Sequence, residues 1–330
     1  MNTINNIGFP GLGIGPFKIS DVAFSILGVK VAWYGIFVTV GILLGILYAF
    51  WRGQKNNGIP VDDMIDVALF SIPAAIIGAK VYYVIFAWNS YESFGDIFTD
   101  FGRGLAVYGG IIFGCVAGFL VCKFKKISFL KVFDSSAPAI MLGQIIGRWG
   151  NFTNMEAYGV PTNLPWRMSV ENYKTAYAEV HPIFLYECLW NILGFVIINF
   201  IYKKKKFDGQ IFLMYITWYG FGRMFIEGIR GEDTLMLGGF RISQVVGFLC
   251  VVIGIALIVL LASKYKTRKL ENEEYAGVYM AAKEKLPDEA IEENVEEIVK
   301  ETDEADEKDK PDEVQDEVNE IEEKKDEKNS

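Results

Sequence analysis

The sequence predicts an all-α, polytopic membrane protein with about seven transmembrane helices and an outward-facing head loop. Three observations support this fold class. Of the 330 residues, 52% are hydrophobic, and the mean hydropathy is +0.25. The apolar residues are grouped in stretches of the roughly 20 residues that a helix needs to cross the hydrocarbon core of a bilayer. Basic residues follow alternate stretches, a pattern that is typical of proteins with several membrane-spanning helices.

Seven segments are long and apolar enough to be predicted as spans. They are residues 24–50, 64–88, 105–122, 134–151, 182–202, 209–228 and 242–263. The second contains Pro73 and Lys80, and the fourth contains Gln144 and Arg148, so these two are less apolar than the others. The first 18 residues lack the basic start and apolar segment of a cleavable signal peptide. We therefore expect the first span to act as its own insertion signal.

The distribution of basic residues predicts the orientation of the chain. Basic residues follow the odd-numbered spans: Arg52, Lys55, Lys123, Lys125, Lys126, Lys131, Lys203 to Lys206, Lys264, Lys266, Arg268 and Lys269. The opposite connections hold only scattered cations: Arg103, Arg167, Lys174 and Arg241. Positively charged loops stay in the cytoplasm. We therefore expect a multi-pass membrane protein with its N-terminus outside and its C-terminus in the cytoplasm.

Charge divides the chain into two predicted regions. Residues 1–270 carry 24 basic and 16 acidic side chains, whereas residues 271–330 carry 8 basic and 25 acidic ones. The resulting charges of +8 and −17 add to the net charge of −9. A basic body suits an anionic membrane surface. A tail with this charge density and few aromatic residues is typical of disorder. We therefore predict a catalytic membrane body at 1–270 and a disordered cytoplasmic tail at 271–330, with 289–323 forming a helix or binding a basic partner as the alternative.

Metal and cofactor chemistry is not expected. The four cysteines, Cys115, Cys122, Cys188 and Cys250, lie in or beside apolar segments and form no C-x-x-C pair. Small apolar helix residues are the simplest interpretation of them. Because the chain contains a single histidine, a zinc site is not predicted. No feature of the sequence indicates a nucleic-acid partner.

The first polar cluster lies at the outer end of the fourth span. It comprises Arg148, Asn151, Asn154, Glu156 and Gly159. Arg148 and Asn151 are three residues apart and therefore share a helix face. An arginine in a span is costly and needs compensation, which points to function. The alternative is an interfacial arginine whose head group reaches outward to water. The long connection 152–181 that follows is expected to cap a substrate-facing site.

The second cluster lies at the outer end of the sixth span. Arg223, Glu227 and Arg230 form one stripe at i, i+4 and i+7. Glu227 can neutralise one arginine but not both, so a surplus positive charge is expected. The planar guanidinium group favours phosphate. The alternative is a structural ion-pair network that ties helices together.

Three further residues complete the predicted outer site. His181 precedes Pro182 at the start of the fifth span, where it is a candidate base or, alternatively, a capping or orienting group. Tyr34 and Tyr108 each precede a glycine near an outer span end and could be ordinary interfacial aromatic residues. Because these groups come from different spans but one side of the bilayer, we expect a single arginine-lined site.

Together, these segments resemble the prolipoprotein diacylglyceryl transferases of bacterial membranes. The strongest match is Gly147-Arg148-x-Gly150-Asn151-Phe152-x-Asn154-x-Glu156-x-x-Gly159. Supporting matches are Trp33-Tyr34-Gly35, Gly78-Ala79-Lys80, His181-Pro-x-x-Leu-Tyr186-Glu187 and Arg223-x-x-x-Glu227-x-x-Arg230. The resemblance covers the whole body, whereas the acidic tail has no counterpart in the family core.

The resemblance implies transfer of the diacylglyceryl group of phosphatidylglycerol to the lipobox cysteine of a prolipoprotein, with release of glycerol 1-phosphate. Membrane lipid and secreted prolipoprotein are then the partners. Arg148 and Arg223 are expected to hold the phosphate charge, together with Tyr34 and Tyr108 as catalytic candidates. The expected substrate-binding residues are Arg148, Asn151, Asn154, Glu156, Gly159, His181, Glu227 and Arg230.

Tyr108 departs from the resemblance, since many family members have histidine before the two glycines at 109–110. A tyrosine with an unperturbed pKa of about 10 is a poor base at pH 7. Tyr108 could instead orient a substrate or be activated by an arginine, and His181 is a possible substitute base.

Two other classes of protein fit the sequence less well than a transferase. A lipid or anion transporter or flippase would place charges near the midplane, but here they lie near one face. An intramembrane protease needs a nucleophile paired with a base, and the sequence has one histidine and no G-x-S-x-G motif. Thioether-linked lipid on a lipobox peptide would distinguish the transferase from both.

Overall fold

A computed structural model describes residues 3–88, 91, 95, 97, 104, 106–231, 236–237 and 239–283, with side chains described up to residue 269. The chain divides into two compact units, Met1–Ser263 and Lys264–Ser330. From residue 284 onward, the predicted tail lies outside the described residues. Arg103 also lies outside them. The predictions made for these residues stay predictions.

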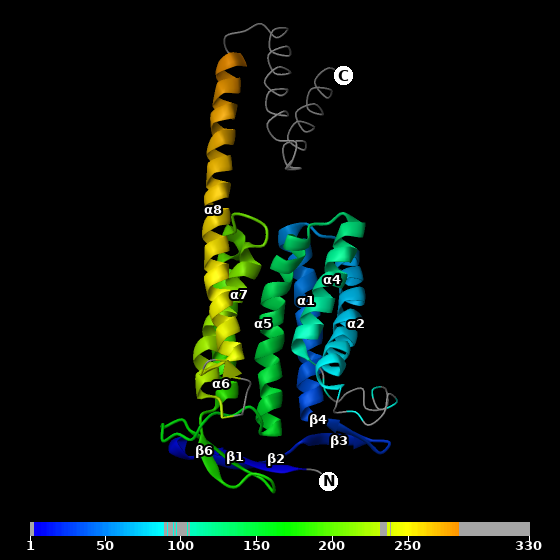
Figure 1. The fold of residues 1–330 in the computed structure, drawn as a ribbon, viewed down its shortest axis with the longest axis vertical. Coiled ribbons are helices and arrows are strands. Elements are labelled where there is room, and N and C mark those ends of the chain that lie inside the picture. Colours follow the sequence, from blue (N-terminus) through cyan, green and yellow to red (C-terminus); the bar gives the residue numbers. More distant parts are fainter. Residues whose placement is uncertain are drawn as a thin grey trace. The chain divides into compact units, whose positions relative to one another are not determined.

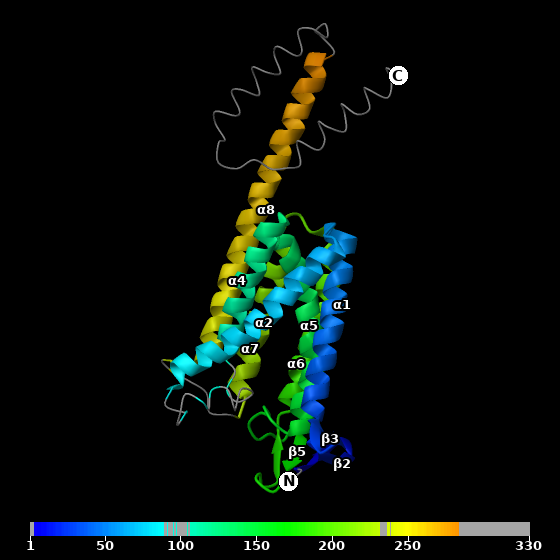
Figure 2. The same cartoon turned by 90° about the vertical axis from the view of Figure 1, so that its right-hand side faces the viewer.

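The first unit is a helical bundle, as predicted (Figures 1 and 2). Its helices are α1 (Trp33–Asn57), α2 (Val61–Phe86), α4 (Val107–Lys125), α5 (Phe129–Asn154), α6 (Ile183–Ile201), α7 (Gln210–Ile226) and α8 (Ile242–Lys283), the last of which continues past Ser263. In the described part of the chain, six helices are long and apolar enough to cross a membrane. The remaining predicted span, 209–228, is the 17-residue α7. The chain is therefore a multi-pass membrane protein, and the count of seven stays a prediction.

A small antiparallel sheet at one end of the bundle was not predicted. It has the order β2 (Ile14–Ser20), β1 (Ile4–Phe9), β5 (Met168–Glu171) and β6 (Ala178–Val180). The N-terminal segment thus pairs with the long connection after α5, with Ile7 opposite Val170. Ile7 and Val170 are fully buried, together with Met168 and Val180. The sheet is hard to predict from the sequence because its strands are short and because the β1–β5 pairing that joins its two hairpins is between distant segments.

Two corrections concern the segments that flank the helices. The first span does not begin at residue 24 but at Trp33, because residues 22–32 form a hairpin of β3 (Val22–Ile26) and β4 (Val29–Ala32). Gly28 turns this hairpin at a φ of +85°, which a glycine adopts without strain. A second short hairpin, β7 (Met236–Leu237) with β8 (Phe240–Arg241), precedes α8.

Helix packing depends on close approach at small residues. A Cβ added to Gly41 of α1 would lie 3.1 Å from the Gly143 carbonyl oxygen of α5. Gly143, Gly147 and Gly150 form a glycine stripe on α5, in which Gly143 lies against Gly41 and Gly150 contacts Tyr34 of α1. Gly147 is different, since a Cβ added there would have no neighbour within 4 Å. The stripe therefore joins α1 to α5 at two points, which sets the position of Tyr34.

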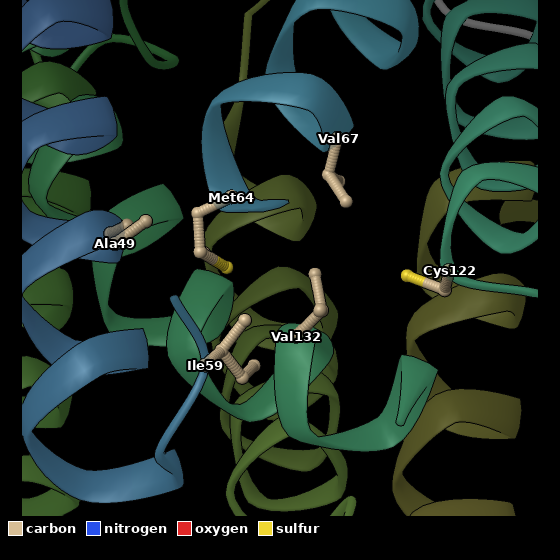
Figure 3. Close-up of a cluster of buried hydrophobic side chains, with 7 residues drawn as sticks. Ala49, Ile59, Met64, Val67, Cys122 and Val132 are labelled. Atoms are coloured by element: carbon tan, nitrogen blue, oxygen red, sulfur yellow. The ribbon is translucent and has the colours of Figure 1, made fainter. Parts of the chain in front are cut away.

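The end of the bundle away from the sheet contains its own core and a buried charge. The core joins α1, α2, α4 and α5 through Ala49, Ile59, Met64, Val67, Cys122, Val132 and Ala139 (Figure 3). Beside it, the fully buried Asp134 of α5 accepts hydrogen bonds from Lys205 Nζ at 3.0 Å, Gly209 N at 2.9 Å and Phe212 N at 3.1 Å. Asp134 therefore fixes the connection between α6 and α7 to α5.

Replacing Asp134 by alanine is expected to lower the free energy of unfolding by about 3–5 kcal/mol, because Lys205 and two backbone N–H groups lose a buried partner. Thermal unfolding in detergent measures this loss. Asp62→Ala, which removes an exposed carboxylate, is the matched control. A midpoint for Asp134→Ala equal to that of the control would contradict the assignment.

Candidate functional site

A cluster of ion pairs lies at the end of the bundle that carries the sheet. It is formed by Arg148 near the end of α5, Glu187 in the first turns of α6, Arg223 near the end of α7, and Glu227 and Arg230 just beyond it. Glu187 is 6% exposed and Glu227 is 1% exposed. Five charged residues from three helices therefore converge where the sequence predicted one site.

Glu187 is the centre of this cluster. Its Oε2 lies 2.6 Å from Arg148 Nη1, and its Oε1 lies 3.0 Å from Arg223 Nη1. One carboxylate thus joins the two arginines that the sequence placed in separate motifs. Glu187 was recognised only as part of the motif after His181 and was not predicted as a site residue. A carboxylate in the first turns of an apolar span was the signal that could have identified it.

Glu227 makes the second set of ion pairs. Its Oε2 lies 2.9 Å from Arg223 Nη2 and 3.8 Å from Arg230 Nη1. Among the residues in direct ion pairs, three arginines therefore face two carboxylates. The neutralising carboxylates are thus two rather than Glu227 alone, and the predicted surplus of positive charge stays a prediction.

Arg148 has donor groups to spare. Its contacts with other described residues run through Nη1, to Glu187 and to Asn151 Oδ1 at 3.3 Å. A guanidinium group has five N–H donors, so those on Nε and Nη2 face no described protein partner. The side chain is 21% exposed. Arg148 can therefore keep its ion pair and still donate to an anionic ligand.

A hydrogen-bond chain extends from Arg148 to the surface. Asn151 accepts from Arg148 and donates from Nδ2 to Glu156 Oε1 at 2.8 Å, and Glu156 is exposed. The helix ends at Asn154 because Met155 takes a left-handed conformation with φ +52°. This end turns Glu156 back toward Asn151, so the predicted spacing brings the two side chains together.

Tyr34 and Gly159 are placed close to this cluster by backbone contacts. A Cβ added to Gly150 would lie 2.8 Å from Tyr34 Cδ2, so Tyr34 packs against Gly150. Gly150 follows Arg148 by two residues in the chain. A Cβ on Gly159 would lie 2.6 Å from His181 Cβ and 2.8 Å from the Ile229 carbonyl oxygen. Gly159 also pairs with Arg230 in an antiparallel bridge. The close approach that ties 155–160 to 227–231 thus requires glycine.

His181 lies in a separate hydrogen-bond chain. Its Nδ1 is 3.2 Å from the Tyr186 hydroxyl, which accepts from Trp166 Nε1 at 2.8 Å. The Tyr186 hydroxyl hydrogen is then available to His181 Nδ1. This geometry favours the orienting role over the role of a base, because the His181 ring contacts the Tyr186 hydroxyl rather than the arginines.

Tyr108 is not brought into contact with the arginines in the described part of the chain. It begins α4, which packs chiefly against α2, and its side chain is 49% exposed. The predicted convergence of the outer segments therefore holds for the α5 motif, the α7 motif and the 181–187 segment through Glu187, but no described contact joins Tyr108 to them.

Arg241 was predicted only as a scattered loop cation. It donates from Nη1 to the Glu227 carbonyl oxygen at 2.7 Å and from Nη2 to the Arg230 carbonyl oxygen at 2.6 Å. It therefore holds the turn that presents Glu227 and Arg230. No spacing in the sequence links Arg241 to that turn.

An apolar groove adjoins the cluster. It is lined by Trp190 of α6 and by Phe221, Gly222, Phe225 and Ile226 of α7. Gly222 directly precedes Arg223, so a cationic group and an apolar groove lie next to each other on α7. An amphiphilic anion has both kinds of surface.

The fold and cluster define a polytopic membrane protein with buried arginine–carboxylate pairs at one end of its bundle. Comparison with known proteins makes the assignment specific, since the family model for prolipoprotein diacylglyceryl transferase matches residues 21–260. The chain belongs to this family.

Several similar proteins are named phosphatidylglycerol–prolipoprotein diacylglyceryl transferase. The one from Finegoldia magna is 44% identical over 255 residues, which cover 77% of this chain and 98% of the relative. The one from Clostridioides difficile is 44% identical over 246 residues, covering 74% and 96%. The one from Listeria innocua is 38% identical over 257 residues, covering 75% and 92%.

The central ion pair can be tested by a double-mutant cycle with Arg148→Gln and Glu187→Gln. Arg148→Gln leaves Glu187 with Arg223 alone, and Glu187→Gln leaves Arg148 without its carboxylate, so the double variant should be about 1–3 kcal/mol more stable than the sum of the single effects predicts. Thermal unfolding of the four proteins measures this coupling.

The control is the ion pair of Arg167 with Glu179 on the sheet, whose side chains are 25% and 29% exposed. Hydrogen bonds from Tyr177 and Arg167 lower the pKa of Glu179, but solvent weakens the pair. Its coupling is expected to be below about 1 kcal/mol. Equal coupling in both cycles would contradict a buried Glu187 bridge.

Proposed function

We propose that this chain transfers the diacylglyceryl group of phosphatidylglycerol to the lipobox cysteine of prolipoproteins. The observation that carries the proposal is one buried carboxylate holding two arginines from different helices beside an apolar groove. The names of relatives that align over more than nine-tenths of their own length support the same reaction.

The proposed reaction breaks the bond between a glycerol carbon of the diacylglyceryl group and a phosphate oxygen. The cysteine sulfur forms the new bond to that carbon, and glycerol 1-phosphate leaves with the bonding electrons. The thiol proton passes to solvent or to the departing phosphate, and the phosphate changes from a diester with one charge to a monoester that carries one or two. Negative charge therefore grows on the phosphate, where preorganised cationic donors stabilise the transition state.

Arg148 and Arg223 are the proposed phosphate donors. Glu187 orients both and keeps the cost of two like charges in an apolar environment low. Because Arg148 keeps N–H donors that face no described residue, the site can still bind an anion. A substrate thiol has an unperturbed pKa of about 8.5, and nearby arginines favour its thiolate form.

The remaining site residues have positioning or binding roles in this proposal. Asn151 and Glu156 orient Arg148. Gly159, Arg230 and His181 hold the connection between α5 and α6 against the bundle. Tyr34 lies beside Gly150 of the same motif. Asn154 is proposed to bind substrate at the end of α5. Tyr108 is proposed to orient substrate from α4, without acting as a base.

We further propose that the sheet and the arginine cluster face outward and that the basic ends face the cytoplasm. The arginine cluster and the sheet lie at one end, and the basic connections after α1, α4 and α6 lie at the other (Figure 1). The positive-inside rule then places the site on the side where secreted prolipoproteins arrive.

Purified protein in detergent should transfer labelled phosphatidylglycerol to a lipobox peptide, producing a diacylglyceryl-sized mass increase on the cysteine. The Clostridioides difficile relative provides the positive control. No addition from a folded sample beside a working control would refute the transferase and favour lipid transport.

Arg148→Ala and Arg223→Ala should each lower kcat by about 10²–10³-fold or more, the effect of removing one donor to a developing oxyanion. Arg167→Ala, which removes an arginine from the sheet, should keep near-normal transfer. Membrane insertion is followed in all three variants. Normal activity in both cluster variants would rule out the phosphate clamp.

Truncation after residue 270 should leave transfer largely intact, because every proposed site residue precedes that position. Activity is compared with that of the full chain at equal amounts of membrane-inserted protein. A loss of activity on truncation would assign the acidic tail a role in the reaction.

A further inference from the structure

Two tryptophans form a reciprocal contact between α6 and α7. Trp190 Nε1 donates to the Trp218 carbonyl oxygen at 3.1 Å, and Trp218 Nε1 donates to the Trp190 carbonyl oxygen at 3.0 Å. Their rings stack with centroids 4.2 Å apart and planes 14° apart. An indole N–H in a lipid environment has no water to bond, so each ring is held to the other helix.

A glycine one turn further along each helix makes this reciprocal tryptophan pair possible. A Cβ on Gly222 would lie 2.3 Å from Trp190 Nε1, and a Cβ on Gly194 would lie 2.3 Å from Trp218 Nε1. Both helices therefore carry the same Trp-x-x-x-Gly spacing, at 190–194 and 218–222. The small residues let the antiparallel helices approach closely enough for the indoles to reach the opposite backbone.

The pair determines how α6 and α7 are aligned. A slide of one residue moves a helix by about 1.5 Å along its axis and turns its side chains by about 100°. Either change would separate both indoles from their acceptors and drive a ring into the backbone beyond the glycine. The pair thus selects one register and one rotation.

That register is also the one that the charge cluster requires. Glu187 lies three residues before Trp190 on α6, and Arg223 directly follows Gly222 on α7. The 3.0 Å contact between Glu187 Oε1 and Arg223 Nη1 lies one turn from the tryptophan pair. A buried ion pair is stabilising only when its geometry is good. A misplacement of about 1 Å in such a site can cost 10²-fold in rate.

We propose that the reciprocal tryptophan pair positions Glu187 against Arg223. Trp190, Trp218, Gly194 and Gly222 are then positioning residues for the arginine cluster. The effect on diacylglyceryl transfer rests on the proposed function, whereas the effect on the ion pair does not.

The test uses Gly222→Ala, because a Cβ there meets Trp190 atoms as its three nearest neighbours. The added methyl group should push Trp190 away from α7. Trp190→Phe, in an otherwise unchanged chain, removes one donated N–H of the pair without adding a methyl group and should act in the same direction. Trp51→Phe, on an exposed tryptophan of α1, is the matched control.

The first measurement is the coupling between Glu187→Gln and Arg223→Gln, obtained from thermal midpoints in each background. The non-additivity should fall by about half or more with Gly222→Ala, fall also with Trp190→Phe, and stay unchanged with Trp51→Phe. A pair that only stabilises the fold would lower all midpoints and leave the coupling unchanged, and this outcome would overturn the proposal.

The second measurement is transfer to a lipobox peptide. Gly222→Ala should lower kcat by about 10²-fold with little change in KM, and Trp190→Phe should lower kcat in the same way. If Gly222→Ala changes the coupling between Glu187 and Arg223 but the unmodified chain shows no transfer, the result would support the positioning role and refute the transferase. If Gly222→Ala does not fold, Trp218→Phe serves instead, since it removes one donated N–H, and unchanged coupling there would also overturn the proposal.

Discussion

The bridge from Glu187 to Arg148 and Arg223 is the interaction on which the functional end of the bundle depends. Two guanidinium groups in a largely apolar setting would repel each other and lose much of their solvation. A single carboxylate that contacts both with separate oxygen atoms offsets these costs. The same bridge makes α5, α6 and α7 mutually dependent, because a shift of any one helix breaks an ion pair.

The surrounding contacts hold this bridge in place from several directions. Gly150 against Tyr34 fixes α5 to α1, and Arg241 binds the carbonyl groups of the turn after α7. The reciprocal tryptophan pair aligns α6 with α7 one turn deeper. These contacts use backbone carbonyl groups and glycines, so they depend on register rather than on charge. A charged site can then remain incompletely neutralised without the helices separating.

The donors of Arg148 that no described residue uses link this structure to the proposed phosphate chemistry. Arg148 makes its ion pair through Nη1, so its other N–H groups can contact an anion. The apolar groove beside Arg223 provides a surface suited to the acyl part of a lipid. Full neutralisation would have produced a stable helix junction with little affinity for an anion. At the other end of the bundle, Asp134 shows that alternative, with its carboxylate satisfied by Lys205 and two backbone N–H groups.

The sequence by itself determined the membrane-spanning segments, the arginine motifs and the family. These follow from local information: apolar runs of about 20 residues, charges within them and short motifs in order. Only the tertiary structure decided which groups meet. It made Glu187 the partner of both arginines, left Gly147 without a neighbour and kept Tyr108 out of contact with the cluster. It also paired the first 20 residues with 168–180 in a sheet. The physical reason is that these contacts join residues far apart in the chain, and their geometry is set by helix register and rotation, which no local pattern records.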